Sequence, residues 1–383
     1  MLGSAMAPVA LAFAILNTLH GSPSDIGIVL AVRQVVLIVL LLFGGVWGDR
    51  LRRNRVMVGS NVVSGLSQAV AAALLLSGGA ALWELAVLAA VNGASSAFFV
   101  PASTGVIPQT VPPTMLQEAN AALRLGLNAT TITGAAIGGV IVAATNPGIA
   151  ILADAVSYGV AAVALALMHL PAGLRLEESS VVQELRDGWH DFWSRTWLWG
   201  IVVQFGVLNA AESGAVNVLG PNVAKQHLGG PAGWGLILTA QAVGLIVSGL
   251  LLLRWRPRRL LLVATFGAFA IALPCLALAR PLALPAVLVF AFGAGCGAQI
   301  FGVLWGTAVQ QEIPQERLSR ISSYDALGSW VLMPIGFAIA GPVAAAIGDR
   351  ATFLGAAATV IVASALVLLS RDVRTLERRP VGA

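Results

Sequence analysis

The chain is a succession of long apolar blocks separated by short polar or Gly/Pro-rich breaks. A helix that spans a bilayer needs roughly 20 mainly apolar residues. No stretch shows the alternation of apolar and polar residues over about ten positions that is typical of a membrane β-barrel. The pattern therefore predicts an all-α membrane protein with twelve transmembrane helices, whose approximate cores are 4–19, 26–47, 56–78, 81–105, 116–145, 148–170, 197–221, 232–253, 260–279, 282–309, 319–347 and 351–370.

Composition agrees with a membrane location. Hydrophobic residues make up 58% of the chain and charged residues only 10%, so a globule in water could not bury the apolar surface. The first block, 4–19, is shorter than the usual range for a spanning helix. Helix 1 is therefore expected either to lack its first turns or to begin further upstream.

The basic residues give an orientation. Of the 22 Lys and Arg residues, 17 follow even-numbered helices, and the odd-numbered exits carry only Lys225, Arg280 and Arg350. Loops rich in Lys and Arg stay in the cytoplasm. We therefore expect a multi-pass protein of the cell (plasma or inner) membrane with both termini cytoplasmic. The net charge of +5 is a topology signal, so a nucleic-acid partner is not required.

One long polar link divides the helices six and six. We expect an N-terminal six-helix bundle over 1–170, an amphipathic cytoplasmic linker over 171–196 that lies on the membrane or simply connects, and a C-terminal bundle over 197–383. The two halves have similar features at corresponding loops, because arginine-rich turns follow both helix 2 and helix 8. Internal repeats of this kind are typical of secondary transporters, which bind substrate near the midplane where the halves meet.

Twelve spans in two sets of six, with the motif G-x-x-x-D-R-x-x-R-x-R at 45–55, resemble the major facilitator superfamily over nearly the whole chain. The segment "FFVPASTGVIPQTVPPTMLQEANAA", 98–122, is similar to the link between helices 4 and 5 of the transmembrane secretion effector branch, which includes enterobactin-exporter-like proteins. Three positions depart from the pattern: Arg52 stands where Gly is usual, Ala135 where proton-driven exporters have Pro, and Ala89 where many carry a buried Arg.

The resemblance implies a conformational gate at the loop after helix 2. A carboxylate such as Asp49 near the N-terminus of helix 11 would be favoured by roughly 0.3–1 kcal/mol, which would hold the cytoplasmic side shut. The alternative is that the arginines only anchor the topology. The gate residues implied are Gly45, Asp49, Arg50, Arg53 and Arg55.

Ionisable residues inside the spans are candidate sites, since a charge in hydrocarbon is costly and normally faces a partner or water. We expect Glu212, Asp154 or Arg33 to bind a proton or cation, with Glu212 first because it lies deep on helix 7 beside a break at Gly220-Pro221. A structural role as hydrogen-bonded or paired groups is the alternative, and Arg33 and Asp154 share a depth that suits pairing. Arg124 and Asp325 form a candidate pair between the bundles.

Polar and aromatic residues on the expected cavity helices suit an amphipathic organic substrate in an otherwise apolar pocket. Each can equally serve helix packing. The candidates are Asn17, Asn92, Ser96, Phe99, Asn209, Gln299 and Trp305. Gly134, Gly138 and Gly139 are expected to allow close packing of helix 5.

These features favour a secondary active exporter of a drug- or siderophore-like molecule that works by alternating access, by proton antiport, as a monomer in the lipid bilayer. A phosphate-binding G-x-x-x-x-G-K-[ST] loop is absent, and the four histidines lack metal-ligand spacing, so we expect no enzyme activity, cofactor or metal. Two alternatives remain: an importer or uniporter of the same fold, and a non-transporting membrane scaffold or sensor.

Overall fold

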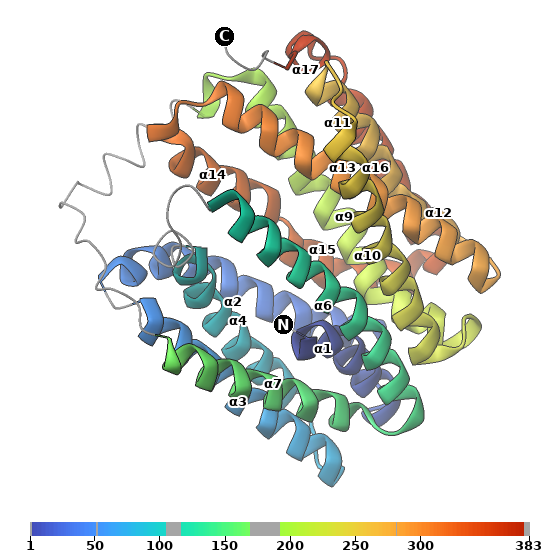
Figure 1. The fold of residues 1–383 in the computed structure, drawn as a ribbon. Helices are drawn as coiled ribbons and strands as arrows, with labels where there is room; N and C mark the ends of the chain where they lie inside the picture. Colours follow the sequence, from blue (N-terminus) through green and yellow to red (C-terminus); the bar gives the residue numbers. More distant parts are fainter. Residues whose placement is uncertain (1, 51–52, 105–115, 169–191, 281, 379–383) are drawn as a thin grey trace. The chain divides into compact units, whose positions relative to one another are not determined.

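The structure is a computed structural model that describes residues 2–50, 53–104, 116–168, 192–280 and 282–378 (Figure 1). Within these ranges it describes all side chains except those of 42–50, 53, 104, 116–122, 124, 125, 128, 315–320 and 323. The linker expected over 171–196 therefore lies largely outside the described residues. Residues 105–115 of the link at 98–122 lie outside them too.

The helices divide into two compact units, Met1–Glu177 with Ala224–Thr239, and Glu178–Val223 with Ala240–Ala383. In the first unit α2 packs on α4, α3 packs on α7 and α4, and α1 packs on α6 and α7 (Figure 1). Its helices are α1 (Leu2–Phe13), the π-helix η1 (Ala14–Thr18), α2 (Pro23–Arg50), α3 (Arg53–Ser77), α4 (Leu82–Thr104), α6 (Leu116–Ala144) and α7 (Pro147–Leu167).

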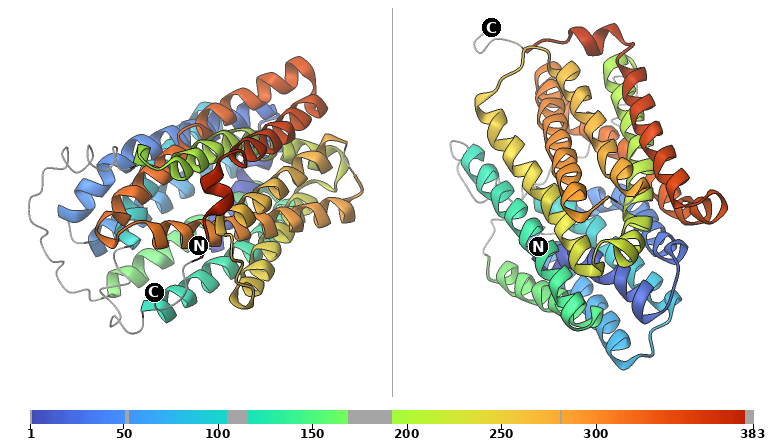
Figure 2. Two further views of the ribbon diagram at one scale, coloured as in Figure 1. Left: turned by 90° about the horizontal axis from the view of Figure 1, so that it is seen from above. Right: turned by 90° about the vertical axis from the view of Figure 1, so that its right-hand side faces the viewer.

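The second unit has the same all-helical character. Here α11 packs on α13, while α12 packs on α13 and α16 (labelled in Figure 1, with two further views of the ribbon in Figure 2). Two helices, α9 (Thr196–His227) and α10 (Gly230–Arg254), contribute residues to both units. The remaining helices are α11 (Leu260–Phe269), the 3-10 turn η3 (Ala270–Ala272), α12 (Leu273–Ala279), α13 (Leu284–Glu312), α14 (Gln315–Trp330), α15 (Met333–Ile347), α16 (Asp349–Val367) and α17 (Arg371–Thr375).

The described residues give twelve spans, as the sequence predicted, when the segments of three interrupted helices are joined. These are α1 with η1, α11 with η3 and α12, and α14 with α15. Ten helical segments of the described chain are long and apolar enough to cross a membrane, and Leu2–Thr18 and Ala129–Ala144 are shorter apolar helices. Large apolar side chains lie exposed on the outer faces, such as Leu66 at 64% and Val289 at 68%. Such exposure is tolerated where lipid, and not water, surrounds the protein.

Proline explains two of the three interrupted spans. Pro has no N–H and its ring clashes with the carbonyl four residues earlier. Pro274 accordingly follows the 3-10 turn at Ala270–Ala272, and Pro334 follows the end of α14 at Trp330. Each break lies just before a proline that the hydropathy pattern had left inside one continuous span.

The break predicted at Gly220-Pro221 is wrong, because α9 continues from Thr196 to His227 with Pro221 inside it. The fixed φ of proline is compatible with a helix, so the cost at this position is one missing backbone hydrogen bond and a local distortion where the ring meets the carbonyl four residues earlier. A membrane helix tolerates that loss where neighbouring groups satisfy the freed carbonyl.

The first span ends in a π-helix, which changes the backbone hydrogen bonds around Leu16. Lys225 Nζ donates a hydrogen bond of 2.7 Å to the Leu16 carbonyl. Both residues belong to the first unit. The contact gives a physical reason for the end of α9 to group with the N-terminal helices.

Candidate functional site

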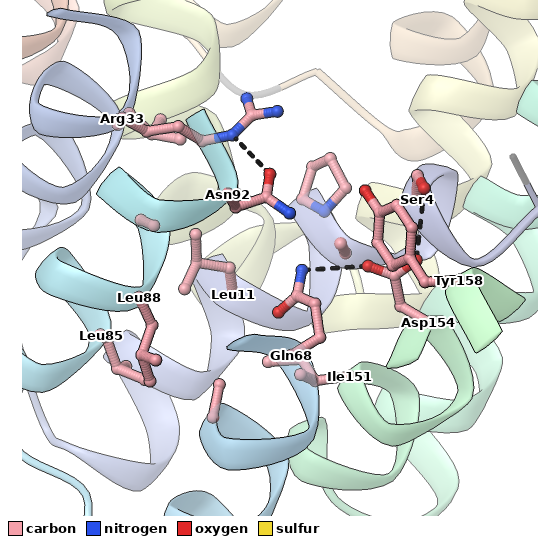
Figure 3. Close-up of a pocket in the computed structure, with 15 residues that line it drawn as sticks. Ser4, Leu11, Arg33, Gln68, Leu85, Leu88, Asn92, Ile151, Asp154 and Tyr158 are labelled. Carbon is pink, nitrogen blue, oxygen red and sulfur yellow. Dashed lines mark hydrogen bonds between the residues drawn. The ribbon is translucent and has the colours of Figure 1, made fainter. Parts of the chain in front are cut away.

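The first unit contains a cavity of about 110 Å³ between α1, α2, α3, α4 and α7 (Figure 3). A water molecule needs roughly 10–15 Å³ by the same measure, so the cavity has room for several. Its wall is mostly apolar. The polar side chains that line it are Ser4, Arg33, Gln68, Asn92, Asp154 and Tyr158.

Arg33 on α2 and Asn92 on α4 form one end of the cavity. Arg33 Nε donates a hydrogen bond of 3.2 Å to Asn92 Oδ1 (Figure 3). The two helices approach closely at this level, because a Cβ atom on Gly93 would lie 3.2 Å from the Arg33 carbonyl carbon. A glycine beside Asn92 therefore allows the guanidinium and the amide to meet.

Asp154 on α7 lies at the other end and is fully buried. Its carboxylate accepts hydrogen bonds from Gln68 Nε2 on α3 at 3.0 Å, from Ser4 Oγ on α1 at 3.3 Å and from Ser157 Oγ at 3.4 Å. A Cβ on Gly3 would lie 2.6 Å from Asp154 Cα, so α1 packs tightly against α7 here. Donors from three helices thus converge on one carboxylate.

The pairing expected between Arg33 and Asp154 is not a direct contact, although both side chains line the same cavity. Arg33 bonds to an amide, and the donors to Asp154 are an amide and two hydroxyls. Among the described residues the donors to Asp154 are neutral, and a buried carboxylate held in this way can bind and release a proton without breaking a hydrogen-bonded ion pair. This arrangement suits Asp154 to reversible protonation.

Glu212, the first-ranked sequence candidate, has a simpler environment on α9 of the second unit. Its side chain is half-buried and Oε2 accepts from the neighbouring Ser213 Oγ at 3.2 Å. Asn209, one of the predicted substrate-cavity residues, lies three residues earlier on α9 and donates from Nδ2 to the Ser329 carbonyl at 3.0 Å. The structure thus directs Asn209 toward α14.

A stripe of small residues that was not predicted from the sequence explains the close packing of α9. Gly206, Ala210 and Gly214 recur every four residues and face Gly328 on α14 and Gly336 on α15. A Cβ on Gly214 would lie 2.6 Å from the Gly336 carbonyl oxygen. Small residues at this spacing let membrane helices approach closely.

Asp325 and Trp305, predicted separately as a pairing residue and a cavity residue, contact each other. Trp305 Nε1 donates to Asp325 Oδ2 at 2.8 Å, and Ser329 Oγ donates to Oδ1 at 3.4 Å. The side chain of Arg124 is outside the described residues. The pair between Arg124 and Asp325 therefore stays a prediction.

Aromatic rings surround Trp305 in the second unit. Phe205 and Phe301 stack with ring centroids 3.9 Å apart, and Phe301 stacks on Trp305 at 6.2 Å. Trp197 meets Trp305 edge to face at 5.7 Å. The spacing of Phe301 and Trp305, four residues apart on α13, was the only available sequence signal for this cluster.

The other predicted substrate-cavity residues are dispersed. Asn17 is exposed on η1, Ser96 Oγ donates to the Asn92 carbonyl at 2.9 Å, and Phe99 packs on a cluster of Met57 and Ala102. Gln299 lies beside Gly249, where a Cβ would be 3.2 Å from its Nε2. Of the predicted set, Asn92 is the residue that lines the cavity of the first unit.

A family model described as "Major Facilitator Superfamily" matches residues 1–328. The chain belongs to the Major Facilitator Superfamily. It is a multi-pass membrane transporter for small molecules, with twelve transmembrane helices in two six-helix bundles.

The curated relatives of this superfamily member include efflux proteins. The chain is 26% identical to the "Multidrug efflux pump Tap" of Mycolicibacterium fortuitum over 375 residues, which cover 94% of this chain and 90% of the relative. It is 22% identical to "Macrolide efflux protein A" of Streptococcus pyogenes, with 87% and 84% covered. The resemblance to an exporter branch agrees with these names.

Solved structures show the same transporter fold. A bacterial homologue of the human lysosomal transporter Spinster, inward-facing and unoccupied, matches with a TM-score of 0.74 at 13% identity and covers 100% of this chain and 96% of that one. A POT family transporter in complex with 5-aminolevulinic acid matches with a TM-score of 0.76 at 12% identity, with 98% and 94% covered. At these identities the likeness concerns the fold alone.

The superfamily loop after helix 2 is short, since α2 ends at Arg50 and α3 begins at Arg53. Arg55 is exposed. For Gly45, Asp49, Arg50 and Arg53 the structure describes the backbone alone. Their gate role stays a prediction.

The three glycines named on α6 lie where neighbouring helices approach. A Cβ on Gly134 would lie 2.5 Å from Ala5 Cβ, and one on Gly138 would lie 2.9 Å from Met6 Cα, both on α1. A Cβ on Gly139 would lie 2.7 Å from the Pro231 carbonyl oxygen on α10. Any larger residue would force these helices apart.

Proposed function

We propose that this transporter exports a small amphipathic organic molecule, drug-like or siderophore-like, by alternating access driven by inward proton movement. The efflux activity named for relatives that match nearly the whole chain supports the direction and the substrate class. The observation that carries the proton coupling is Asp154, a buried carboxylate within a spanning helix that neutral donors hold beside a cavity large enough for water.

The chemistry of Asp154 gives a mechanism for coupling. A carboxylate in a low-dielectric layer is costly when charged, and protonation removes that cost. Gln68 and Ser4 come from different helices, so gain or loss of the charge changes how strongly α3 and α1 are held to α7. Protonation can thereby bias the first bundle between two arrangements.

The remaining candidate residues have, in this proposal, the roles expected from the sequence. Arg33 is the buried cation of the same cavity, and Glu212 is a second proton site in the other bundle. Asp49 latches the cytoplasmic side, and the transporter works as a monomer with both termini in the cytoplasm. Asn17, Asn92, Ser96, Phe99, Asn209, Gln299 and Trp305 contribute polar and aromatic contacts to substrate, Asn92 through the cavity and Trp305 beside Asp325.

Transport in inverted membrane vesicles tests the proposal. Radiolabelled erythromycin, a macrolide, and a panel of fluorescent multidrug-pump dyes serve as probes, with an acid-inside gradient imposed. We expect uptake that an uncoupler abolishes and that vesicles without the protein lack. Uptake that persists with the uncoupler indicates a uniporter, and no movement of any probe indicates a non-transporting protein; either result contradicts the proposal.

A further inference from the structure

Arg33 carries a charge that its recorded contacts do not neutralise. A guanidinium keeps its proton at any physiological pH and presents five N–H donors. In the described structure its side-chain bond runs from Nε to the neutral Asn92 amide, and Asp154 is bonded to other groups. Among the described side chains, no carboxylate contacts the remaining guanidinium N–H groups in this membrane span, and Asp154 acts on Arg33 only through space across the cavity. A buried cation of this kind normally meets a counter-charge or water.

Asn92, the partner of Arg33, has an unpaired hydrogen-bond donor. The side chain is 6% exposed and lines the cavity, and its Nδ2 is buried without a hydrogen-bond partner among the described residues. The orientation of the amide is fixed, because Arg33 can only donate and therefore requires the oxygen. The amide nitrogen must then point away from Arg33 into the cavity, as Figure 3 shows. An unpaired buried N–H group is costly unless an acceptor meets it.

We propose that the Arg33–Asn92 end of this cavity binds a small monovalent anion, either a halide or a carboxylate group. Arg33 supplies the charge and Asn92 Nδ2 supplies a second donor, so the site pairs one cationic and one neutral donor at the same end of a cavity of about 110 Å³. Apolar residues such as Leu11 and Leu88 form much of the remaining wall. The site lies within the first unit. It goes beyond the export function and depends on the cavity alone.

Asp154 couples this anion to a proton. The charged or titratable side chains among the described residues that line the cavity are Arg33 on α2 and Asp154 and Tyr158 on α7, while α1, α3 and α4 contribute Ser4, Gln68 and Asn92. An anion is repelled when Asp154 is ionised and accepted when it is protonated. Anion affinity therefore rises as the pH falls, and bound anion favours proton uptake by the same reciprocal coupling.

Thermal unfolding of the purified full chain in nanodiscs measures the binding. Sodium chloride, bromide, formate or acetate replaces the bulky morpholinoethanesulfonate salt at constant ionic strength, at pH 5.5 and pH 7.5. We expect the unfolding midpoint to rise with at least one class of small anion, with a lower half-saturating concentration at pH 5.5. A response to halides alone identifies an ion site, and a response to formate or acetate identifies a carboxylate site; both support the proposal.

Four variants assign the response to residues. Arg33→Gln should abolish it, and Asn92→Ala should raise the half-saturating concentration about tenfold or more, the value of one charge-assisted hydrogen bond. Asp154→Asn should keep the response and remove its pH dependence. Asn61→Ala is the matched control, because Asn61 is a buried Asn on α3 whose Nδ2 already donates to the Met57 carbonyl at 2.8 Å. It should respond to anions like the wild type.

A crystal structure of the wild-type chain with bromide gives a reading that does not depend on variants. Anomalous density between Arg33 and Asn92 Nδ2 supports the site. Water alone at this position, an unfolding midpoint that no small anion shifts, or equal anion responses in the wild type and Arg33→Gln would overturn the proposal. Erythromycin efflux is measured in vesicles free of these anions. A failure of the anion-binding proposal therefore leaves the export proposal standing, and a failure of the export proposal leaves anion binding standing.

Discussion

Asp154 in the first unit and Glu212 in the second are both carboxylates within spanning helices, yet their surroundings differ. Asp154 is fully buried and receives donors from α1, α3 and its own helix beside a cavity. Glu212 is half-buried and its recorded donor is the next residue along α9. Depth along a helix made Glu212 the stronger candidate from sequence. Convergence of side chains from several helices favours Asp154.

The largest expected difference between the two candidates is in efflux activity after each carboxylate is replaced by its amide. We expect Asp154→Asn to abolish proton-driven efflux of erythromycin, because the amide cannot take up or release the proton. Glu212→Gln should retain most of it. The measurement is initial uptake into inverted vesicles with an acid-inside gradient.

Asp154→Glu serves as the rescue control, since it keeps the proton-binding group and should restore part of the uptake. Equal transport by Asp154→Asn and the wild type, or a loss confined to Glu212→Gln, would reverse the ranking of the two sites.

A packing change next to Glu212 tests whether α9 is held mainly by its small-residue stripe. Gly214→Val should lower the free energy of unfolding by about 1–3 kcal/mol, the usual cost of overpacking, since its Cβ would meet the Gly336 carbonyl. Gly200→Val on the same helix is the control, because a Cβ there has no heavy atom within 4 Å. Thermal unfolding in nanodiscs compares them. Equal midpoints for the two variants would remove the stripe from the explanation.

The smallest expected effects on stability and efflux come from removing one hydrogen-bond donor to each carboxylate. Gln68→Leu should cost about 0.6 kcal/mol of stability, the average for a hydrogen bond between membrane helices, and should shift the pH dependence of efflux because a donor to the ionised form is lost. Ser213→Ala removes the donor to Glu212 and should leave that pH profile unchanged.

The pH profile of efflux, and not its maximum rate, is the informative readout for these two variants. A merely structural role for Gln68 would lower the rate at every pH by the same factor.

The spans were predictable because length and hydropathy are local properties of the chain. The π-helix at Ala14–Thr18 and the breaks before Pro274 and Pro334 were not predicted, since hydropathy is blind to backbone hydrogen bonds. The prediction of a break at Pro221 was wrong for the same reason. A proline in a membrane helix can either interrupt the helix or lie within it, and the neighbouring groups that satisfy the freed carbonyl decide which occurs.

The cavity was predictable only in pieces. Arg33, Asn92 and Asp154 were each named from sequence, but hydropathy does not say which helices pack together, so Asn92 was not placed beside Arg33. Ser4, Gln68 and Tyr158 were missed because a single polar residue on an apolar helix has no period to reveal it. Gly3 sets the close spacing of α1 and α7, and Gly93 sets that of α4 and α2, which brings these side chains together.

Proton movement driven by substrate tests the coupling at Asp154 without an imposed pH gradient. Inverted vesicles carry a pH-sensitive dye inside, and erythromycin is added outside. We predict that wild-type vesicles become more alkaline inside as the drug enters and that Asp154→Asn vesicles show no pH change. Drug entry into wild-type vesicles with no change in internal pH, or an equal change with Asp154→Asn, would contradict the assignment.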